Sequence, residues 1–113
     1  MSYIHKKGVD TARRRMTTRQ QCSDLISYGQ ITTKLSYART TQKYFEKLIT
    51  LAKVDNLITK RKAYSIVLRT SKFTREELVK KLFEELAKKY RSRKGGYTRL
   101  LKTSKGSFLV QLV

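Results

Sequence analysis

The chain has 113 residues, and 27 lysines and arginines against 8 aspartates and glutamates give it a formal charge of +19. Its length suits one domain with a modest core, and 39% hydrophobic residues argue against general disorder. Such a charge repels itself, so we expect a polyanionic partner: nucleic acid, an anionic membrane surface or an acidic protein. The apolar runs are too short to span a bilayer, no signal peptide is recognisable, and a lone cysteine excludes an internal disulfide framework and fits a reducing cytoplasm.

The acidic residues are unevenly placed along the chain. Before Phe45 the acids are Asp10 and Asp24 alone, and after Tyr90 there are none. The middle can therefore form a charge-balanced, solvated surface, whereas both ends carry nearly pure positive charge. This polarity predicts that the two ends of the sequence meet the polyanion.

The first nine residues predict a basic N-terminal arm. Residues 1–9 show no hydrophobic period and carry Lys6 and Lys7. Tyr3 is the best candidate in this arm for stacking on an unpaired base. Because no proline, repeat or low-complexity linker divides the rest, residues 10–113 are expected to form a single α+β domain that binds nucleic acid.

A helix is expected from Thr11 to Tyr28, with Asp10 as its N-cap and Gly29 at its end. Its N-terminal half is basic nearly all round, which suits a core poorly. The apolar residues that share one arc of this helix are Ala12, Met16, Cys22, Leu25 and Ile26. We expect only the C-terminal half to be buried.

A short β-branched run centred on Ile31 and Thr32 predicts a strand. Thr33 is then expected to cap a helix over about residues 34–53. Apolar residues recur at helical spacing on one face of that helix: Ala38, Phe45, Leu48, Ile49 and Ala52.

Two further helices are predicted. One runs from Leu57 to Leu68, after a break at Asp55 and Asn56, and its inward residues are expected to be Leu57, Tyr64 and Val67. The other begins where Thr74 and Glu77 can form a capping box. Its apolar positions follow the pattern of an amphipathic helix and are Val79, Leu82, Phe83, Leu86, Ala87 and Tyr90.

The segment RKGGYTRLLKT contains paired glycines beside a lysine, as some phosphate-binding loops do. Such a loop needs its glycines between a strand and a helix, but Gly95 and Gly96 follow a helix and precede a strand. They are better explained as a turn that requires positive φ. In the following strand, one face is expected to hold Tyr97, Arg99 and Leu101 and the other Thr98, Leu100 and Lys102.

A hairpin loop at residues 104–107 returns the chain into a last strand, Phe108 to Val113. This strand is apolar on both faces apart from Gln111, so it is expected to be central. The elements in order are helix, strand, three helices and two strands. They predict an α+β domain in which helices pack on a small sheet.

No group of residues suggests catalysis. His5 is the sole histidine and lies on the arm, so neither a metal cluster nor a histidine-based acid–base site can be assembled. Cys22 fits a buried structural thiol better than a nucleophile. The paired acids at 76–77 and 84–85 suit a helix start and a solvated face. We therefore expect no enzyme, no cofactor and no small-molecule substrate.

Nucleic-acid contact is favoured over a solvated surface for the basic residues, because few acids accompany them. The four arginines at 13, 14, 15 and 19 are expected to serve binding and not folding. The candidate RNA-binding residues are Lys6, Lys7, Arg13, Arg14, Arg15, Arg19, Lys34, Arg39, Arg91, Arg93, Lys94, Arg99, Lys102 and Lys105. A nucleoid-type DNA-binding protein without catalysis is the alternative, although no minor-groove wedge is visible.

Three stretches carry a family resemblance: ITTKLSYARTTQKYFEKLITLAK, KLFEELAKKYRSRKGGYTRLLKT and the closing VQLV. With them the whole chain resembles the bacterial large-subunit ribosomal protein family numbered seventeen. The resemblance implies a two-layer α/β fold, with about four helices on a mixed three-stranded sheet, and no catalytic activity. It also implies a cytoplasmic, ribosome-associated protein that binds large-subunit ribosomal RNA near the nascent-chain exit, beside neighbouring large-subunit proteins and away from any membrane.

Overall fold

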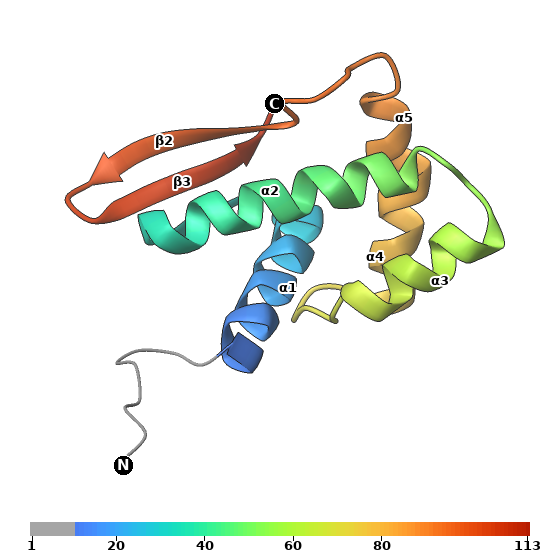
Figure 1. Ribbon diagram of the computed structural model, residues 1–113, viewed down its shortest axis with the longest axis horizontal. Helices are drawn as coiled ribbons and strands as arrows, with labels where there is room; N and C mark the ends of the chain where they lie inside the picture. The colour runs from blue at the N-terminus through green and yellow to red at the C-terminus, as the bar shows by residue number, and fades with distance from the viewer. Residues whose placement is uncertain (1–10) are drawn as a thin grey trace, which may run out of the picture.

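A computed structural model describes residues 11–113 (Figure 1). The predicted arm, with Lys6 and Lys7, the N-cap Asp10, Tyr3 and His5, lies outside the described residues. The elements are α1 (Thr11–Tyr28), β1 (Gln30–Thr33), α2 (Leu35–Ala52), α3 (Leu57–Ile66), α4 (Arg75–Lys81), η1 (Leu82–Leu86), α5 (Ala87–Lys89), β2 (Thr98–Ser104) and β3 (Ser107–Leu112). The three elements α4, η1 (a π-helical turn) and α5 follow one another without a break and together form the single helix predicted after Thr74. The predicted order of elements is therefore confirmed.

The three strands form an antiparallel sheet in the order β1-β3-β2. The expectation of a mixed sheet is wrong. A tight turn at Lys105 and Gly106 makes β2 and β3 antiparallel, and Gly106 adopts the positive φ of 79° that such turns favour. β1 enters beside β3 because the carbonyl oxygen of Gly29 accepts a hydrogen bond from the amide of Leu112 at 3.0 Å. The central position predicted for the last strand is confirmed.

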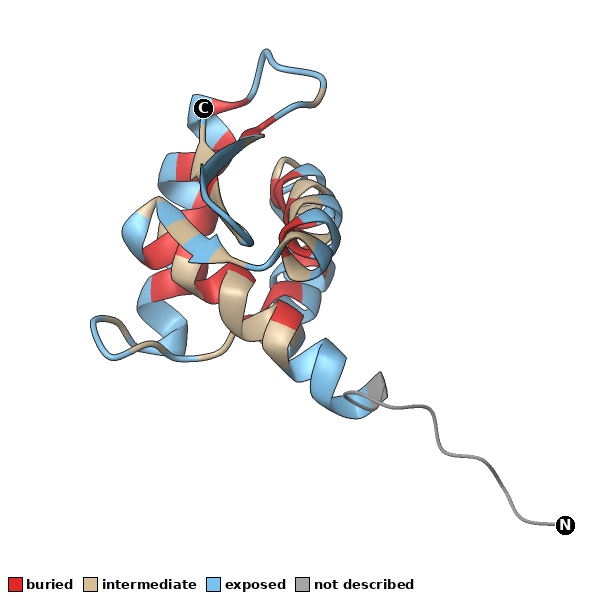
Figure 2. Ribbon diagram, turned by 90° about the vertical axis from the view of Figure 1, so that its left-hand side faces the viewer, coloured by how far each residue is buried: buried red, intermediate tan, exposed pale blue. Residues whose placement is uncertain are grey.

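Helix α2 lies across one face of the sheet and contacts all three strands. Figure 2, in which the ribbon is coloured by burial, shows buried residues along α2 and along the helices beside it. On the sheet, Val110 is fully buried, and the side chains of Ile31, Leu100, Phe108 and Leu112 pack against the same core. All five predicted inward residues of α2 are buried. The core therefore lies between the sheet and α2, and continues among the helices.

Helix α1 begins and ends as predicted, and its buried apolar residues come from its C-terminal half, as expected. Ala12 and Met16, in the N-terminal half, are exposed, Met16 by 49%. Cys22, Leu25 and Ile26 are buried as expected. The first turns of α1 extend beyond the body of the domain, which leaves their apolar residues without a packing surface (Figure 2).

The predicted cap of α2 is wrong. Thr33 is the last residue of β1, and its hydroxyl accepts a hydrogen bond from the Gln21 side-chain amide at 3.0 Å. Lys34 occupies the N-cap position without a side-chain cap. Thr33 pairs with Phe108 in the sheet, and this pairing outweighs the preference of threonine for a helix cap.

Helix α3 ends two residues earlier than predicted, at Ile66, and its first residue does not point inward. Leu57 is 63% exposed, because it follows the Asn56 cap at a turn that extends into solvent. Val67 is buried as expected, and Tyr64 is half-buried against the core.

The capping box at the start of α4 is confirmed: the Glu77 amide donates to Thr74 Oγ1 and the Thr74 amide to Glu77 Oε1, both at 3.3 Å. All six predicted inward positions of this helix are buried. Leu78 is fully buried as well, since it lies one turn before Leu82 on the same face.

The chain turns into β2 at Gly96, which has the predicted positive φ of 64°, whereas Gly95 does not have one. Arg99 and Leu101 are exposed, and Thr98 is buried, as the alternation predicted. Tyr97 departs from it: it precedes the strand and is 1% exposed. Its ring packs at 5.2 Å from that of Tyr90, so the core captures it.

Candidate nucleic-acid interface

The basic candidates fall into three groups at separate corners of the molecule (Figure 1). The first lies at the start of α1, the second at the hairpin end of the sheet, and the third in the loop between α5 and β2. The sequence showed positive charge at both ends of the chain, but β2 divides the candidates at the C-terminal end into two groups. Its seven residues separate the ends by about 23 Å at the usual rise of a strand.

The first group consists of Arg13, Arg14 and Arg15, all exposed in the first turns of α1. Arg14 and Arg15 form no ion pair with any residue from 11 to 113. Arg19, four residues on, differs from them, since its guanidinium donates to the carbonyl oxygens of Ser65 and Ile66. The expectation that all four arginines stand apart from folding is therefore wrong for Arg19.

The second group is formed by the sheet register. Thr33 pairs with Phe108, and Phe108 pairs with Lys102, so these three lie side by side at one end of the sheet. Lys34 follows Thr33, and Lys105 lies in the turn beyond a bulge in β2. Lys34, Lys102 and Lys105 are all exposed. Residues that are about seventy positions apart in sequence thus present positive charge at one end of the domain.

Arg99 lies away from this end, on the outer face of the sheet. Its Nε donates to Gln111 Oε1 at 2.8 Å, and Gln111 Nε2 donates to Gln30 Oε1 at 3.1 Å. One polar row therefore crosses all three strands. It holds the Arg99 guanidinium in a fixed position on a face that no described helix covers.

The third group consists of Arg91, Arg93 and Lys94, which are exposed between α5 and β2. Arg93 Nε donates within the loop, to the carbonyl oxygens of Gly95 at 3.2 Å and Gly96 at 3.1 Å. This loop lies beside the C-terminal end of α2, whereas Lys34 stands at its N-terminal end. The 18 residues of α2 therefore hold the second and third groups about 27 Å apart.

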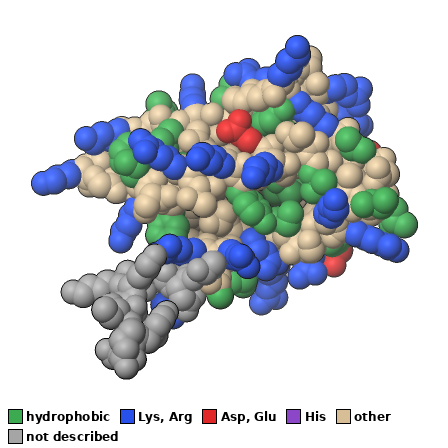
Figure 3. Space-filling view, viewed as in Figure 1, with side chains coloured by type: hydrophobic (Ala, Val, Ile, Leu, Met, Phe, Trp, Pro, Cys, Tyr) green, Lys and Arg blue, Asp and Glu red, His purple; other side chains and the backbone are tan. Residues whose placement is uncertain are grey.

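Two further basic residues were missed by the sequence reasoning. Arg39, a candidate already, is exposed on α2, and Lys43 and Lys47 are exposed at the same helical spacing of four residues. Figure 3 shows Lys and Arg side chains across the face where α2 runs. The spacing of four was the signal that could have identified them. Arg39, Lys43 and Lys47 form a row along α2 that runs from the second group toward the third.

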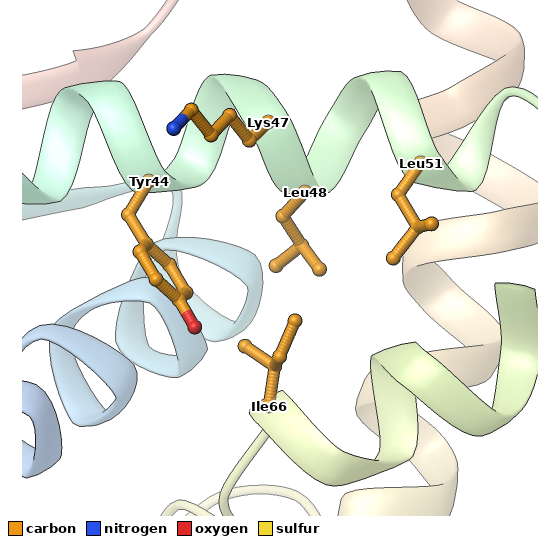
Figure 4. Close-up of a pocket in the computed structure, with 5 residues that line it drawn as sticks. All are labelled: Tyr44, Lys47, Leu48, Leu51 and Ile66. Carbon is orange, nitrogen blue, oxygen red and sulfur yellow. The ribbon is translucent and has the colours of Figure 1, made fainter.

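A groove between α2 and α3 offers no catalytic chemistry. It has a volume of about 270 Å³ and is lined by Tyr44, Lys47, Leu48, Leu51 and Ile66, with Leu48 and Leu51 on α2 pointing toward Ile66 (Figure 4). None of these side chains is an acid, a histidine or a cysteine. Within residues 11–113, no cluster of three or more acids, histidines or cysteines is placed to hold a metal ion.

The single cysteine is a structural residue. Cys22 is 1% exposed, and its burial raises the pKa of the thiol to about 12. A thiol with such a pKa stays protonated at neutral pH and is a poor nucleophile. The expected buried structural role is confirmed.

The charge of the described chain is weakly neutralised from within. Between residues 11 and 113 we find one ion pair between side chains, Lys60 to Asp55 at 3.3 Å, and both side chains are largely exposed. No described helix is long and apolar enough to cross a membrane. The surface therefore suits a partner that brings many negative charges of its own.

Comparison with known proteins shows the family of the chain. The family model described as Ribosomal protein L17 matches residues 17–108. The chain belongs to the ribosomal protein L17 family. It is therefore a ribosomal protein and not an enzyme, and both predictions are confirmed.

Individual relatives of this family match along most of the chain. The large ribosomal subunit protein bL17 of Malacoplasma penetrans is 52% identical over 102 residues, covering 90% of this chain and 86% of its own. That of Mycoplasma genitalium is 47% identical and covers 90% and 83%. That of a Thermoanaerobacter species is 41% identical over 97 residues and covers 86% and 81%. The L17 chain described here therefore spans most of the length of its relatives.

Proposed function

We propose that this L17 protein is a structural component of the large ribosomal subunit that binds ribosomal RNA through its three basic groups and its N-terminal arm. Its site of action is the ribosome, in the cytoplasm. The observation that carries this proposal is the exposure of arginines and lysines at three corners of one domain, without acids beside most of them. Folded RNA brings phosphates from several helices to one protein, whereas a single DNA duplex offers one continuous groove.

Arginine in the first group and lysine in the second suit different tasks. The planar guanidinium of Arg14 or Arg15 can donate two hydrogen bonds to one phosphate, whereas Lys102 and Lys105 act as compact point charges on mobile stems. Contacts of both kinds fix the position of the protein on RNA without reading its sequence. The specificity of the complex then comes from the shape of the RNA.

Salt dependence of RNA binding tests this proposal. If about six phosphates are engaged, the slope of log affinity against log salt should have a magnitude of about 4 or more for large-subunit ribosomal RNA. Duplex DNA of equal length is the competitor. Equal affinity for ribosomal RNA and duplex DNA would favour a nucleoid-type DNA-binding protein. A slope near zero would contradict binding through phosphate neutralisation.

Neighbouring large-subunit proteins are the second class of partner that we propose. Three apolar side chains, Val54, Leu57 and Ile58, are 55%, 63% and 65% exposed where α2 passes into α3. Such side chains gain little from RNA phosphate but gain free energy when another protein covers them. A position near the nascent-chain exit follows from the family resemblance. Crosslinking from this corner within assembled subunits would identify the neighbours and test that position.

A further inference from the structure

The loop between α5 and β2 runs back along α2 and is attached to it at two places. At the C-terminal end of α2, Lys53 Nζ donates to the carbonyl oxygen of Arg93. About two turns earlier, Glu46 Oε1 accepts a hydrogen bond from the Gly96 amide at 2.9 Å. We call residues 91–97 the basic loop. Its backbone conformation is thus fixed by two charged side chains of the neighbouring helix.

Tyr97 anchors the end of the basic loop in the core. Its Oη donates to the Arg93 carbonyl oxygen at 3.0 Å and accepts from Lys53 Nζ at 2.5 Å. The same ammonium lies 4.6 Å from the centroid of the Tyr97 ring. The Val113 amide also donates to the Tyr97 carbonyl oxygen at 3.0 Å. A segment without regular secondary structure is therefore held at both ends.

The position of Glu46 is unexpected for a surface that binds phosphate. Its carboxylate lies beside a loop that presents Arg91, Arg93 and Lys94 to solvent. A negative charge there repels RNA and partly offsets the attraction of the arginines. The same carboxylate also fixes the position of the Gly96 amide, at a residue with a positive φ of 64°.

We infer that Glu46 and Lys53 are positioning residues for RNA binding, which hold the basic loop in its binding conformation before the RNA arrives. The inference rests on the function proposed above. A loop that is already ordered loses less conformational entropy when it binds, so its phosphate contacts yield more affinity. Arg91, Arg93 and Lys94 touch the phosphates in this account, and Glu46 and Lys53 act through them.

Replacing Glu46 separates order from charge, because the two effects have opposite signs. Glu46→Ala removes a negative charge and should strengthen RNA binding if charge alone matters. If the carboxylate orders the loop, affinity for purified large-subunit ribosomal RNA should instead fall by about fivefold, the factor expected when one loop residue must be ordered anew. Glu46→Gln keeps an oxygen acceptor without the charge and should bind at least as well as the unchanged chain.

Glu85→Ala is the matched control. Glu85 is exposed on η1, and its side chain makes no hydrogen bond or ion pair within residues 11–113, so replacing it by Ala changes mainly the charge. Hydrogen exchange of the Gly96 amide provides a readout that does not depend on RNA. The amide should be protected in the unchanged chain, in Glu46→Gln and in Glu85→Ala, and should exchange faster in Glu46→Ala.

The outcomes are distinct. Weaker RNA binding and faster Gly96 exchange in Glu46→Ala, with an unchanged midpoint of thermal unfolding, support the inference. Binding as tight as that of Glu85→Ala overturns it and leaves the proposed function intact. If the unchanged chain itself lacks salt-dependent RNA binding, the proposed function fails first and the inference falls with it.

A second variant decides the matter if Glu46→Ala does not fold. Tyr97→Phe removes a hydroxyl from the Arg93 carbonyl and from Lys53 without changing any charge. We expect RNA affinity to fall by about threefold or more, because two hydrogen bonds that hold the basic loop are lost. Unchanged affinity in Tyr97→Phe would contradict the positioning role.

Discussion

Arg19 in α1 donates from Nε to the carbonyl oxygen of Ile66, the last residue of α3, at 2.9 Å. Its Nη2 donates to the carbonyl oxygen of Ser65 at 2.8 Å. The last carbonyl groups of a helix have no partner within it, and a positive charge at this end is favourable to the helix dipole. Arg19 therefore ties the first helix to the third, across 47 residues of sequence.

The four arginines of α1 should separate into one that stabilises the fold and three that bind RNA. Arg19→Gln should lower the free energy of unfolding by about 1–2 kcal/mol, because two charge-assisted hydrogen bonds at a partly exposed site are lost. Thermal or urea unfolding measures this. The double replacement of Arg14 and Arg15 by Gln is the control and should leave stability unchanged or slightly higher, since like charges are removed.

Replacing Arg13, Arg14 and Arg15 together by Gln should weaken RNA binding. Each arginine that meets a phosphate contributes up to about one unit to the slope of log affinity against log salt, so the slope should flatten by up to about three units. Replacing Lys60, Arg61 and Lys62 on α3 by Gln removes the same charge from another face and should flatten it less. Equal effects of the two triple variants would mean that only net charge matters.

The helix that starts at Thr74 should depend on its buried leucines. Leu82 is 0% exposed, and Leu82→Ala should cost about 2–5 kcal/mol because a cavity remains in the core. Leu57→Ala is the matched control at a residue 63% exposed, and it should change stability by about 0.5 kcal/mol or less. Urea unfolding of both variants measures the difference. A midpoint for Leu82→Ala equal to that of the unchanged chain would show that the inward face is misassigned.

Burial of Cys22 should make stability fall in alkaline solution. The folded chain holds the thiol proton up to a pKa of about 12, whereas the unfolded chain releases it near the ordinary thiol pKa of 9.0. Between these values the folded state binds more protons, so stability is fully present below pH 9 and decreases as pH rises, by up to about 1.4 kcal/mol per unit. Unfolding measured against pH for the unchanged chain and Cys22→Ala isolates this contribution, because other groups titrate alike in both. Parallel curves would refute it.

Much of the fold was predictable because its signals are local. The helix at Thr74 shows its capping box and apolar spacing within one segment, and β3 shows its central place by being apolar on both faces. The direction of β1 was not predictable, since no local pattern records which strand it pairs with. The role of Thr33 was mispredicted for the same reason. Threonine is a good capping residue, but Thr33 ends a strand because it pairs with Phe108, far away in the sequence.

The basic residues of the candidate interface were identified by composition, but their grouping was not. Composition marks Lys34 and Lys102 as basic, yet only the register through Phe108 brings them to one end of the sheet. Arg19 has the same side chain as its neighbours and a different role, because its partners lie on another helix. Nor does any local pattern distinguish Glu46, which contacts a loop 50 residues away, from a solvated acid.

The most direct test of the account is the sedimentation of the protein in a sucrose gradient after ribosomal subunits are separated by removal of Mg²⁺. We expect it in the large-subunit fraction at about one copy per subunit, and in the free fraction after ribonuclease treatment. Recovery with the small subunit, with chromosomal DNA, or as free protein before ribonuclease treatment would contradict the account.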